Sequence, residues 1–157
     1  METRKPKGRK FLIRDEMNKI LLVDDEPEWC GPYLEILAVG FEVIVKHSAQ
    51  AALDYVETHL DIEGVILDVM MPTPQGVSTS LTNRSLDTGI WMVGELKEYI
   101  LGHKCPVIVI TNREKRLFQE RLDTHKIDLN LMVVKMKSEI NPNMLAVIMR
   151  QMIDSNK

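Results

Sequence analysis

The chain has 157 residues, of which 45% are hydrophobic and 27% charged, and its formal net charge is −3. These values predict one soluble globular domain with a sizeable core and argue against a second full domain. No run approaches the roughly 20 apolar residues that a membrane-spanning helix needs, so we expect no membrane partner.

Residues 1–20 are basic, with seven Lys/Arg against three Asp/Glu. No long apolar segment follows this basic start, which excludes a secretory signal and predicts a cytoplasmic location. We interpret residues 1–18 as a basic N-terminal arm without an assigned function, and we do not expect nucleic acid as a partner. Cys30 and Cys105 form no disulfide or zinc-binding pattern, so we expect buried, reduced thiols.

Residues 19–157 show a regular alternation of strand and helix patterns. Two prolines, Pro27 and Pro32, leave two starts open for the first helix, because proline fits the first helical turn. Ser48 and Asn141 are placed to cap later helices. The alternation predicts a single doubly wound, five-stranded parallel sheet with helices on both faces, an α/β fold. The expected strands are 19–24, 41–45, 64–68, 106–111 and 131–135, and the third, fourth and fifth helices are expected at about 91–101, 114–126 and from 141 onward.

Two of the apolar strand patterns end in carboxylates. Asp24 and Asp25 follow the first strand, and Asp68 ends the third. The carboxyl ends of parallel strands share one sheet edge, where ligands bind in open α/β folds. Carboxylates this close repel one another, and a divalent cation such as Mg²⁺ removes that repulsion with hard oxygen ligands. We therefore predict a Mg²⁺ pocket with Asp25 and Asp68 as direct ligands and Asp24 acting largely through water.

Each acid also has a simpler explanation when taken alone. Asp24 and Asp25 fit a helix-capping turn, because acids favour helix starts, and Asp68 fits a loop. The joint arrangement favours a site, because Thr111 and Lys135 stand at the expected ends of the fourth and fifth strands. With Met71-Pro72 after the third strand, this set strongly resembles the receiver domain of two-component response regulators. The resemblance covers residues 19–154 and implies a flavodoxin-like, CheY-like fold.

The resemblance also implies a chemistry. Asp68 would accept a phosphoryl group, with Mg²⁺ bound, from a histidine kinase or a histidine phosphotransfer protein. The backbone carbonyl of Met70 would be a further metal ligand, and Lys135 would balance charge on the transferring oxygens. The hydroxyl of Thr111 would bind the phosphoryl group and draw the following loop inward. Such a protein signals through a downstream protein partner and is not a turnover enzyme on a separate substrate.

The chain departs from the family pattern in four places. Residues 77–88 look like an inserted loop beside the site, either a lid, a docking loop, a filter on phosphodonors or a flexible excursion. Asn112 replaces the very small residue that usually follows the threonine. Met132 stands three residues before Lys135, where an aromatic residue is common, and Met136 replaces the usual proline after the lysine. The signalling half is therefore expected to work differently.

Three hypotheses about the function follow, in order of preference. The chain ends about three residues after its last helix pattern, so we expect a stand-alone receiver that signals through a surface including Lys115, Arg116, Glu120 and Arg121. The alternative is a phosphate-independent, receiver-like adaptor, which Mg²⁺-dependent modification of Asp68 would exclude. A phosphohydrolase of the haloacid dehalogenase type ranks last, because it normally has a second aspartate two residues after its nucleophile.

Overall fold

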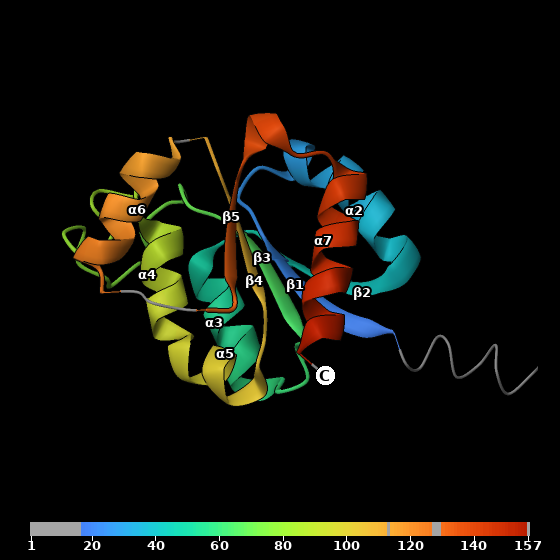
Figure 1. Cartoon of the computed structure of the whole chain (residues 1–157). Helices are drawn as coiled ribbons and strands as arrows, with labels where there is room; N and C mark the ends of the chain where they lie inside the picture. Colours follow the sequence, from blue (N-terminus) through green and yellow to red (C-terminus); the bar gives the residue numbers. More distant parts are fainter. Residues whose placement is uncertain (1–16, 113, 127–129, 157) are drawn as a thin grey trace, which may run out of the picture.

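The structure, a computed structural model, describes residues 17–112, 114–126 and 130–156. Five strands form one parallel sheet in the order β2-β1-β3-β4-β5, which confirms the predicted sheet (Figure 1). The strands are β1 (Asn18–Val23), β2 (Phe41–Lys46), β3 (Gly64–Asp68), β4 (Val107–Thr111) and β5 (Met132–Met136).

Helices cover both faces of the sheet, as predicted (Figure 1). One layer contains α2 (Pro27–Gly40) and α7 (Pro142–Ser155). The opposite layer contains α3 (Ala49–Thr58), α4 (Thr88–Glu95), α5 (Lys97–His103) and α6 (Lys115–Thr124). Each layer packs on its own buried cluster, so the sheet is the middle of a three-layer domain.

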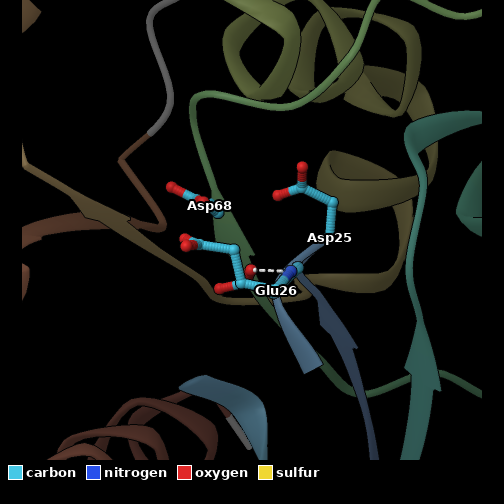
Figure 2. A group of neighbouring side chains, drawn as sticks. Asp25, Glu26 and Asp68 are labelled. Atoms are coloured by element: carbon cyan, nitrogen blue, oxygen red, sulfur yellow. Dashed lines mark hydrogen bonds between the residues drawn. The ribbon is translucent and has the colours of Figure 1, made fainter. Parts of the chain in front are cut away.

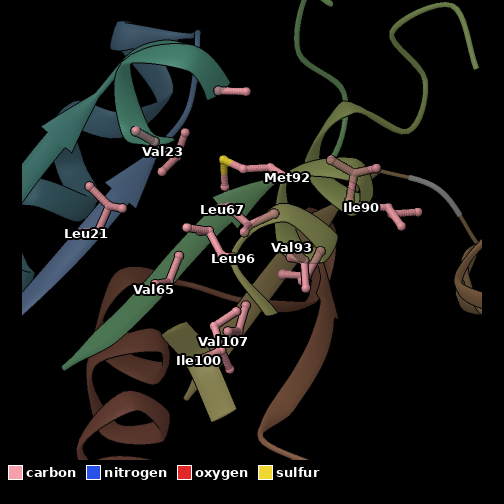
Figure 3. Packing of buried hydrophobic residues seen from close by; sticks show 14 of the residues in the cluster. Leu21, Val23, Val65, Leu67, Ile90, Met92, Val93, Leu96, Ile100 and Val107 are labelled. Atoms are coloured by element: carbon pink, nitrogen blue, oxygen red, sulfur yellow. The ribbon is translucent and has the colours of Figure 1, made fainter. Parts of the chain in front are cut away.

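The central strand β3 and its neighbour β4 are buried along their whole length, and this explains their continuous apolar sequences. Alternate side chains of each strand enter opposite layers of the core. Figure 3 shows the cluster on the α3–α6 side, where strand residues meet α4 and α5. Strand residues in that cluster are Leu21, Val23, Val65, Leu67, Val107 and Val109. The sheet is therefore held by a hydrophobic core on each of its faces. These cores fix the position of the strand ends that carry the acids.

Local signals placed several helix ends correctly. The hydroxyl of Ser48 accepts a hydrogen bond from the backbone N–H of Ala51 at 3.1 Å, and the side chain of Asn141 accepts one from Met144 at 2.9 Å. Both predicted caps are confirmed. Of the two open starts for α2, the structure uses Pro27.

The helix predicted over residues 91–101 is divided in two. α4 begins earlier, at Thr88, and ends at Glu95, and α5 begins at Lys97 after a break at Leu96. Gly94 lies next to this break and has a low helix propensity. The sequence periodicity alone did not show the interruption.

The connection from β3 to α4 is held by its own hydroxyl groups. The buried Thr82 hydroxyl lies 2.6 Å from that of Thr73, and Ser85 accepts a hydrogen bond from the backbone N–H of Thr73 at 2.9 Å. The backbone has positive φ at Asn83, Arg84 and Ser85, which makes this a tight reversal. Of the readings left open for residues 77–88, a loosely attached excursion fits these contacts least well.

β5 extends one residue beyond its predicted end. Met136 pairs with Thr111, the last residue of β4, and Lys135 pairs with Ile110 inside the ladder. The first side chain to leave the sheet edge after β5 is therefore that of Lys137, which has consequences for the site.

The thiols of Cys30 and Cys105 are free and buried, as expected, and burial raises the pKa of each to about 12. The basic arm proposed for residues 1–18 falls almost wholly outside the described residues. Within the described ranges, no helix is both long enough and apolar enough to cross a bilayer.

Candidate functional site

Four acidic side chains meet at the carboxyl edge of the sheet. Asp24, Asp25, Glu26 and Asp68 each place a carboxylate oxygen within 4.8 Å of the others. Figure 2 shows three of them, Asp25, Glu26 and Asp68. The register explains this proximity: Val23 at the end of β1 pairs with Leu67, so the residues that follow these two lie side by side. The predicted convergence of the acids from the first and third strands is therefore what the structure contains.

Asp24 is the most deeply buried member of this acidic cluster, with 1% of its surface exposed. Its Oδ1 accepts a hydrogen bond from the backbone N–H of Glu26 at 2.8 Å. Its Oδ2 is buried without a hydrogen-bond partner among the described residues. Burial raises the pKa of Asp24 above its ordinary value. A buried oxygen without a partner is costly, and a bound cation would satisfy it.

Asp68 ends β3 and is 5% exposed. Burial raises its pKa to about 6, and the nearby charge of Asp24 acts in the same direction, while Lys137 opposes both. The carboxylate oxygens of the acidic cluster are hard ligands in a partly desolvated pocket, and Mg²⁺ prefers such ligands. The residues present are thus suited to hold a divalent cation, with Asp24 and Asp68 buried, Asp25 half-buried and Glu26 exposed.

One lysine compensates the negative charge of the acidic cluster. Nζ of Lys137 lies 3.1 Å from Oε1 of Glu26, 3.3 Å from Oδ2 of Asp68 and 3.9 Å from Oδ2 of Asp24. It also lies over the ring of Trp29, 4.6 Å from the centroid. Burial acts to lower the pKa of Lys137, but the neighbouring acids outweigh it and the pKa is raised, so the ammonium stays charged.

The placement predicted for Lys135 is therefore wrong. Lys135 lies within β5, opposite Ile110, and lines a separate surface hollow with Val133 and Met152. Lys137 occupies the place that we expected of Lys135, because β5 reaches Met136 before the chain leaves the sheet. The two departures from the family pattern whose positions were counted from the lysine, at Met132 and Met136, therefore move to other residues.

Counted from Lys137, the residue three places earlier is Val134 and the residue that follows is Ser138. Neither is the aromatic residue or the proline of the family pattern, so both departures remain although Met132 and Met136 no longer carry them. The structure thus contains the acidic pocket and its lysine, but the position three residues before that lysine holds no aromatic side chain.

Two predicted site residues lie where the sequence placed them. Thr111 ends β4 and is buried, and it follows Ile110, the partner of Asp68 in the sheet. Met70 lies two residues beyond Asp68 and has an exposed side chain, between the buried Val69 and Met71. The roles of the Thr111 hydroxyl and of the Met70 carbonyl stay predictions.

Reasoning from the sequence missed Glu26 and Lys137. Glu26 is the third acid in the run after β1, so its nearness to the pocket was visible but not used. Lys137 is one of two lysines separated by Met136, and the sequence contains no signal that fixes which of them leaves the sheet. Only the strand register selects Lys137.

Sequence comparison finds relatives among response regulators, although no protein-family model matches the chain. The transcriptional regulatory protein CpxR of Escherichia coli K12 is 38% identical over 102 residues, which are 64% of this chain and 36% of CpxR. The heme response regulator HssR of Staphylococcus saprophyticus is 43% identical over 63 residues, 38% of this chain and 27% of HssR. The chain thus spans about a third of the length of these curated relatives.

Comparison of folds finds receiver proteins that superpose on this chain over nearly their whole length. A response regulator receiver protein from Sinorhizobium medicae superposes with a TM-score of 0.70 at 18% identity, over 90% of this chain and 98% of the other. The BeF3-activated DrrB receiver domain gives 0.65 at 20% identity, over 88% and 98%. CheY4 of Vibrio cholerae gives 0.63 at 19% identity, over 87% and 98%. The predicted CheY-like fold is confirmed: the chain has the fold of receiver domains and is similar in sequence to part of the response regulators CpxR and HssR.

Proposed function

We propose that this receiver domain is a phosphorylation switch in which the carboxylate of Asp68 accepts a phosphoryl group from a phosphohistidine donor. One observation carries the proposal: a buried carboxylate at a strand end lies 3.3 Å from the ammonium of Lys137, a side chain that is 9% exposed, within a group of four acids. A structural ion pair needs only one acid for each lysine, whereas this pocket has an excess of negative charge, which a divalent cation would balance.

The side chains divide the chemistry between them. An oxygen of Asp68 attacks phosphorus as the bond to the donor imidazole breaks, and the imidazole leaves with the bonding electrons. Lys137 balances negative charge on the transferring oxygens. The hydroxyl of Thr111, at the neighbouring strand end, donates a hydrogen bond to a phosphoryl oxygen. We propose that Asp24, Asp25 and Asp68 hold Mg²⁺, which neutralises charge on the phosphoryl oxygens when bound.

The raised pKa of Asp68 bears on this role. At a pKa of about 6, the carboxylate is ionised at neutral pH and remains a competent nucleophile. The acyl phosphate that forms carries more negative charge than the carboxylate, so its stability in this buried pocket depends on pairing with Lys137 and a metal.

We further propose that the domain acts in the cytoplasm as a signalling module rather than as a turnover enzyme. The donor would be a histidine kinase or a histidine phosphotransfer protein. The output would pass by protein contact, and the free, buried thiols support a reducing compartment. Phosphorylation replaces the singly charged carboxylate with an acyl phosphate, a net gain of about one negative charge at the sheet edge, and this change can shift a two-state surface.

The test is the intact mass of the protein after incubation with acetyl phosphate, with Mg²⁺ or with EDTA. One phosphoryl adduct is expected on the wild type with Mg²⁺, and none with EDTA or on Asp68→Asn. The control Asp61→Asn, which alters an exposed acid paired with Lys19, should leave the adduct unchanged. No adduct, together with poor Mg²⁺ binding, would overturn the proposal and favour a phosphate-independent adaptor.

A further inference from the structure

A buried ion cluster joins the connection after β3 to helix α6. Asp87, the last residue before α4, is fully buried. Its Oδ2 accepts a hydrogen bond from Nε of Arg121 at 2.6 Å and lies 3.1 Å from Nε2 of His125. Arg121 belongs to α6 and His125 is its C-cap residue. We call these three residues the Asp87 clasp.

The clasp is a specific connection. A buried carboxylate is costly unless it is paired, so Asp87 holds its two partners close. Arg121 was expected to lie on a solvated signalling face, but its side chain is only 29% exposed and its Nε contacts Asp87. On the same helix, the side chain of Arg116 is 74% exposed and lies 4.0 Å from that of Glu120, one turn further along the helix. The contrast separates a structural contact from ordinary surface charge.

Asp87 is itself bound to the phosphoacceptor segment through the residues that follow it. The hydroxyl of Thr88 donates a hydrogen bond to the carbonyl of Met71 at 2.5 Å, and the backbone N–H of Gly89 donates one to the carbonyl of Val69 at 2.8 Å. A Cβ at Gly89 would come within 2.7 Å of the Cα of Val69, so the backbones are in direct contact. The start of α4 cannot shift without disturbing the residues just after Asp68.

The other end of the clasp leads back to the same pocket. α6 begins at Lys115, four positions after Thr111. If Thr111 moves toward the phosphoryl oxygen to which it donates its hydrogen bond in the proposed function, the start of α6 is displaced with it. A shift of α6 by about 1–2 Å, typical of switching helices, would stretch the 2.6 Å contact beyond hydrogen-bonding range.

We propose that Asp87 is a positioning residue that holds α6 in the resting arrangement and thereby weakens binding of the phosphoryl group at Asp68. The inference rests on the proposed function. A contact made only in the resting state stabilises that state, so its removal shifts the population toward the phosphoryl-bound state. By linkage, the affinity of the pocket for a phosphoryl mimic must then rise.

The experiment is calorimetric titration of the full chain with beryllofluoride in the presence of Mg²⁺. Asp87→Asn and Arg121→Gln should bind about fivefold or more tightly than the wild type, within the usual range of allosteric coupling. Arg121→Lys, which keeps a cation near Asp87, should fall back toward wild-type affinity. Arg116→Gln, a matched loss of charge on the same helix, should leave the affinity unchanged.

The outcomes separate the two levels of the argument. A purely structural clasp would leave the affinity unchanged or lower it in Asp87→Asn and Arg121→Gln, and either result would overturn the inference while the proposed function stands. Failure of the wild type to bind beryllofluoride would overturn the proposed function and the inference with it. Arg121→Gln leaves His125 beside Asp87, so it keeps the test available if Asp87→Asn does not fold.

Discussion

The raised pKa of Asp68 predicts that this carboxylate destabilises the metal-free protein. The pKa is about 6 in the folded protein and 3.8 ordinarily. Between these values the folded state binds more protons than the unfolded state, so stability falls as the pH rises through this window. A shift of this size corresponds to about 3 kcal/mol once Asp68 is ionised in both states.

Substitution of Asp68 by Asn removes this loss and keeps an oxygen that can accept a hydrogen bond from Lys137. We expect Asp68→Asn to be more stable than the wild type by about 1–3 kcal/mol at pH 8 without metal, the upper limit being the full pKa shift. The gain should shrink toward zero near pH 4, where both forms are uncharged at this position.

The assay is urea unfolding followed by circular dichroism in EDTA at pH 4.5, 6 and 8. Asp61→Asn is the matched control with the opposite sign, because the 2.6 Å contact with Lys19 lowers the pKa of Asp61. That substitution should give no gain at pH 8. A wild type as stable as Asp68→Asn at pH 8, or a gain that is the same at every pH, would refute the reasoning.

Three other predictions follow from the pocket and its supports. Lys137→Gln should lower the rate of phosphorylation by acetyl phosphate about tenfold or more, whereas Lys135→Gln should keep a rate near that of the wild type. A time course of intact mass measures both rates, and equal losses in the two variants would contradict the assignment of Lys137 to the pocket. Gly89→Ala should cost about 1–3 kcal/mol in urea unfolding, because its Cβ would come within 2.7 Å of the Cα of the residue after Asp68. The control Gly102→Ala, in α5 with open space around its Cβ, should instead gain about 0.5–1 kcal/mol, and equal effects would refute the packing argument. Mg²⁺ affinity measured by calorimetry should fall steeply below pH 6, because the ligands must be ionised to bind; a flat profile would exclude Asp68 as a ligand.

The fold was predictable because its signals are local and repeated. Continuous apolar runs such as residues 65–67 mark strands buried on both faces, and they alternate with helical periodicity along the chain. Ser48 and Asn141 fixed two helix starts for the same reason, since a cap acts on the backbone within three residues. Nothing in these signals needs information from distant parts of the chain.

The acidic half of the site was predictable for a related reason. Asp24 and Asp68 come directly after buried strands, and parallel strands bring their carboxyl ends together. The lysine was not predictable, because the choice between Lys135 and Lys137 depends on pairing across the sheet. Met136 pairs with Thr111, a contact between residues 25 positions apart that no local pattern reveals.

The Asp87 clasp lay further outside the reach of the sequence. Asp87 stands in a polar stretch that looks like an exposed loop, and Arg121 and His125 look like ordinary charges on a solvated helix. Their pairing depends on how the connection after β3 folds back against α6 (Figure 1). Burial of a charge in such a stretch becomes visible only with the tertiary structure.

The central claim is that Asp68 is the phosphoacceptor, and localising the modified residue tests it most directly. Protein treated with acetyl phosphate and Mg²⁺ would be reduced with borohydride, which converts an acyl phosphate to an alcohol, and the peptides sequenced by mass spectrometry. The account predicts homoserine at position 68 and unmodified Asp24 and Asp25. Modification of either of those two acids in place of Asp68, or of none in protein shown to bind Mg²⁺, would contradict it.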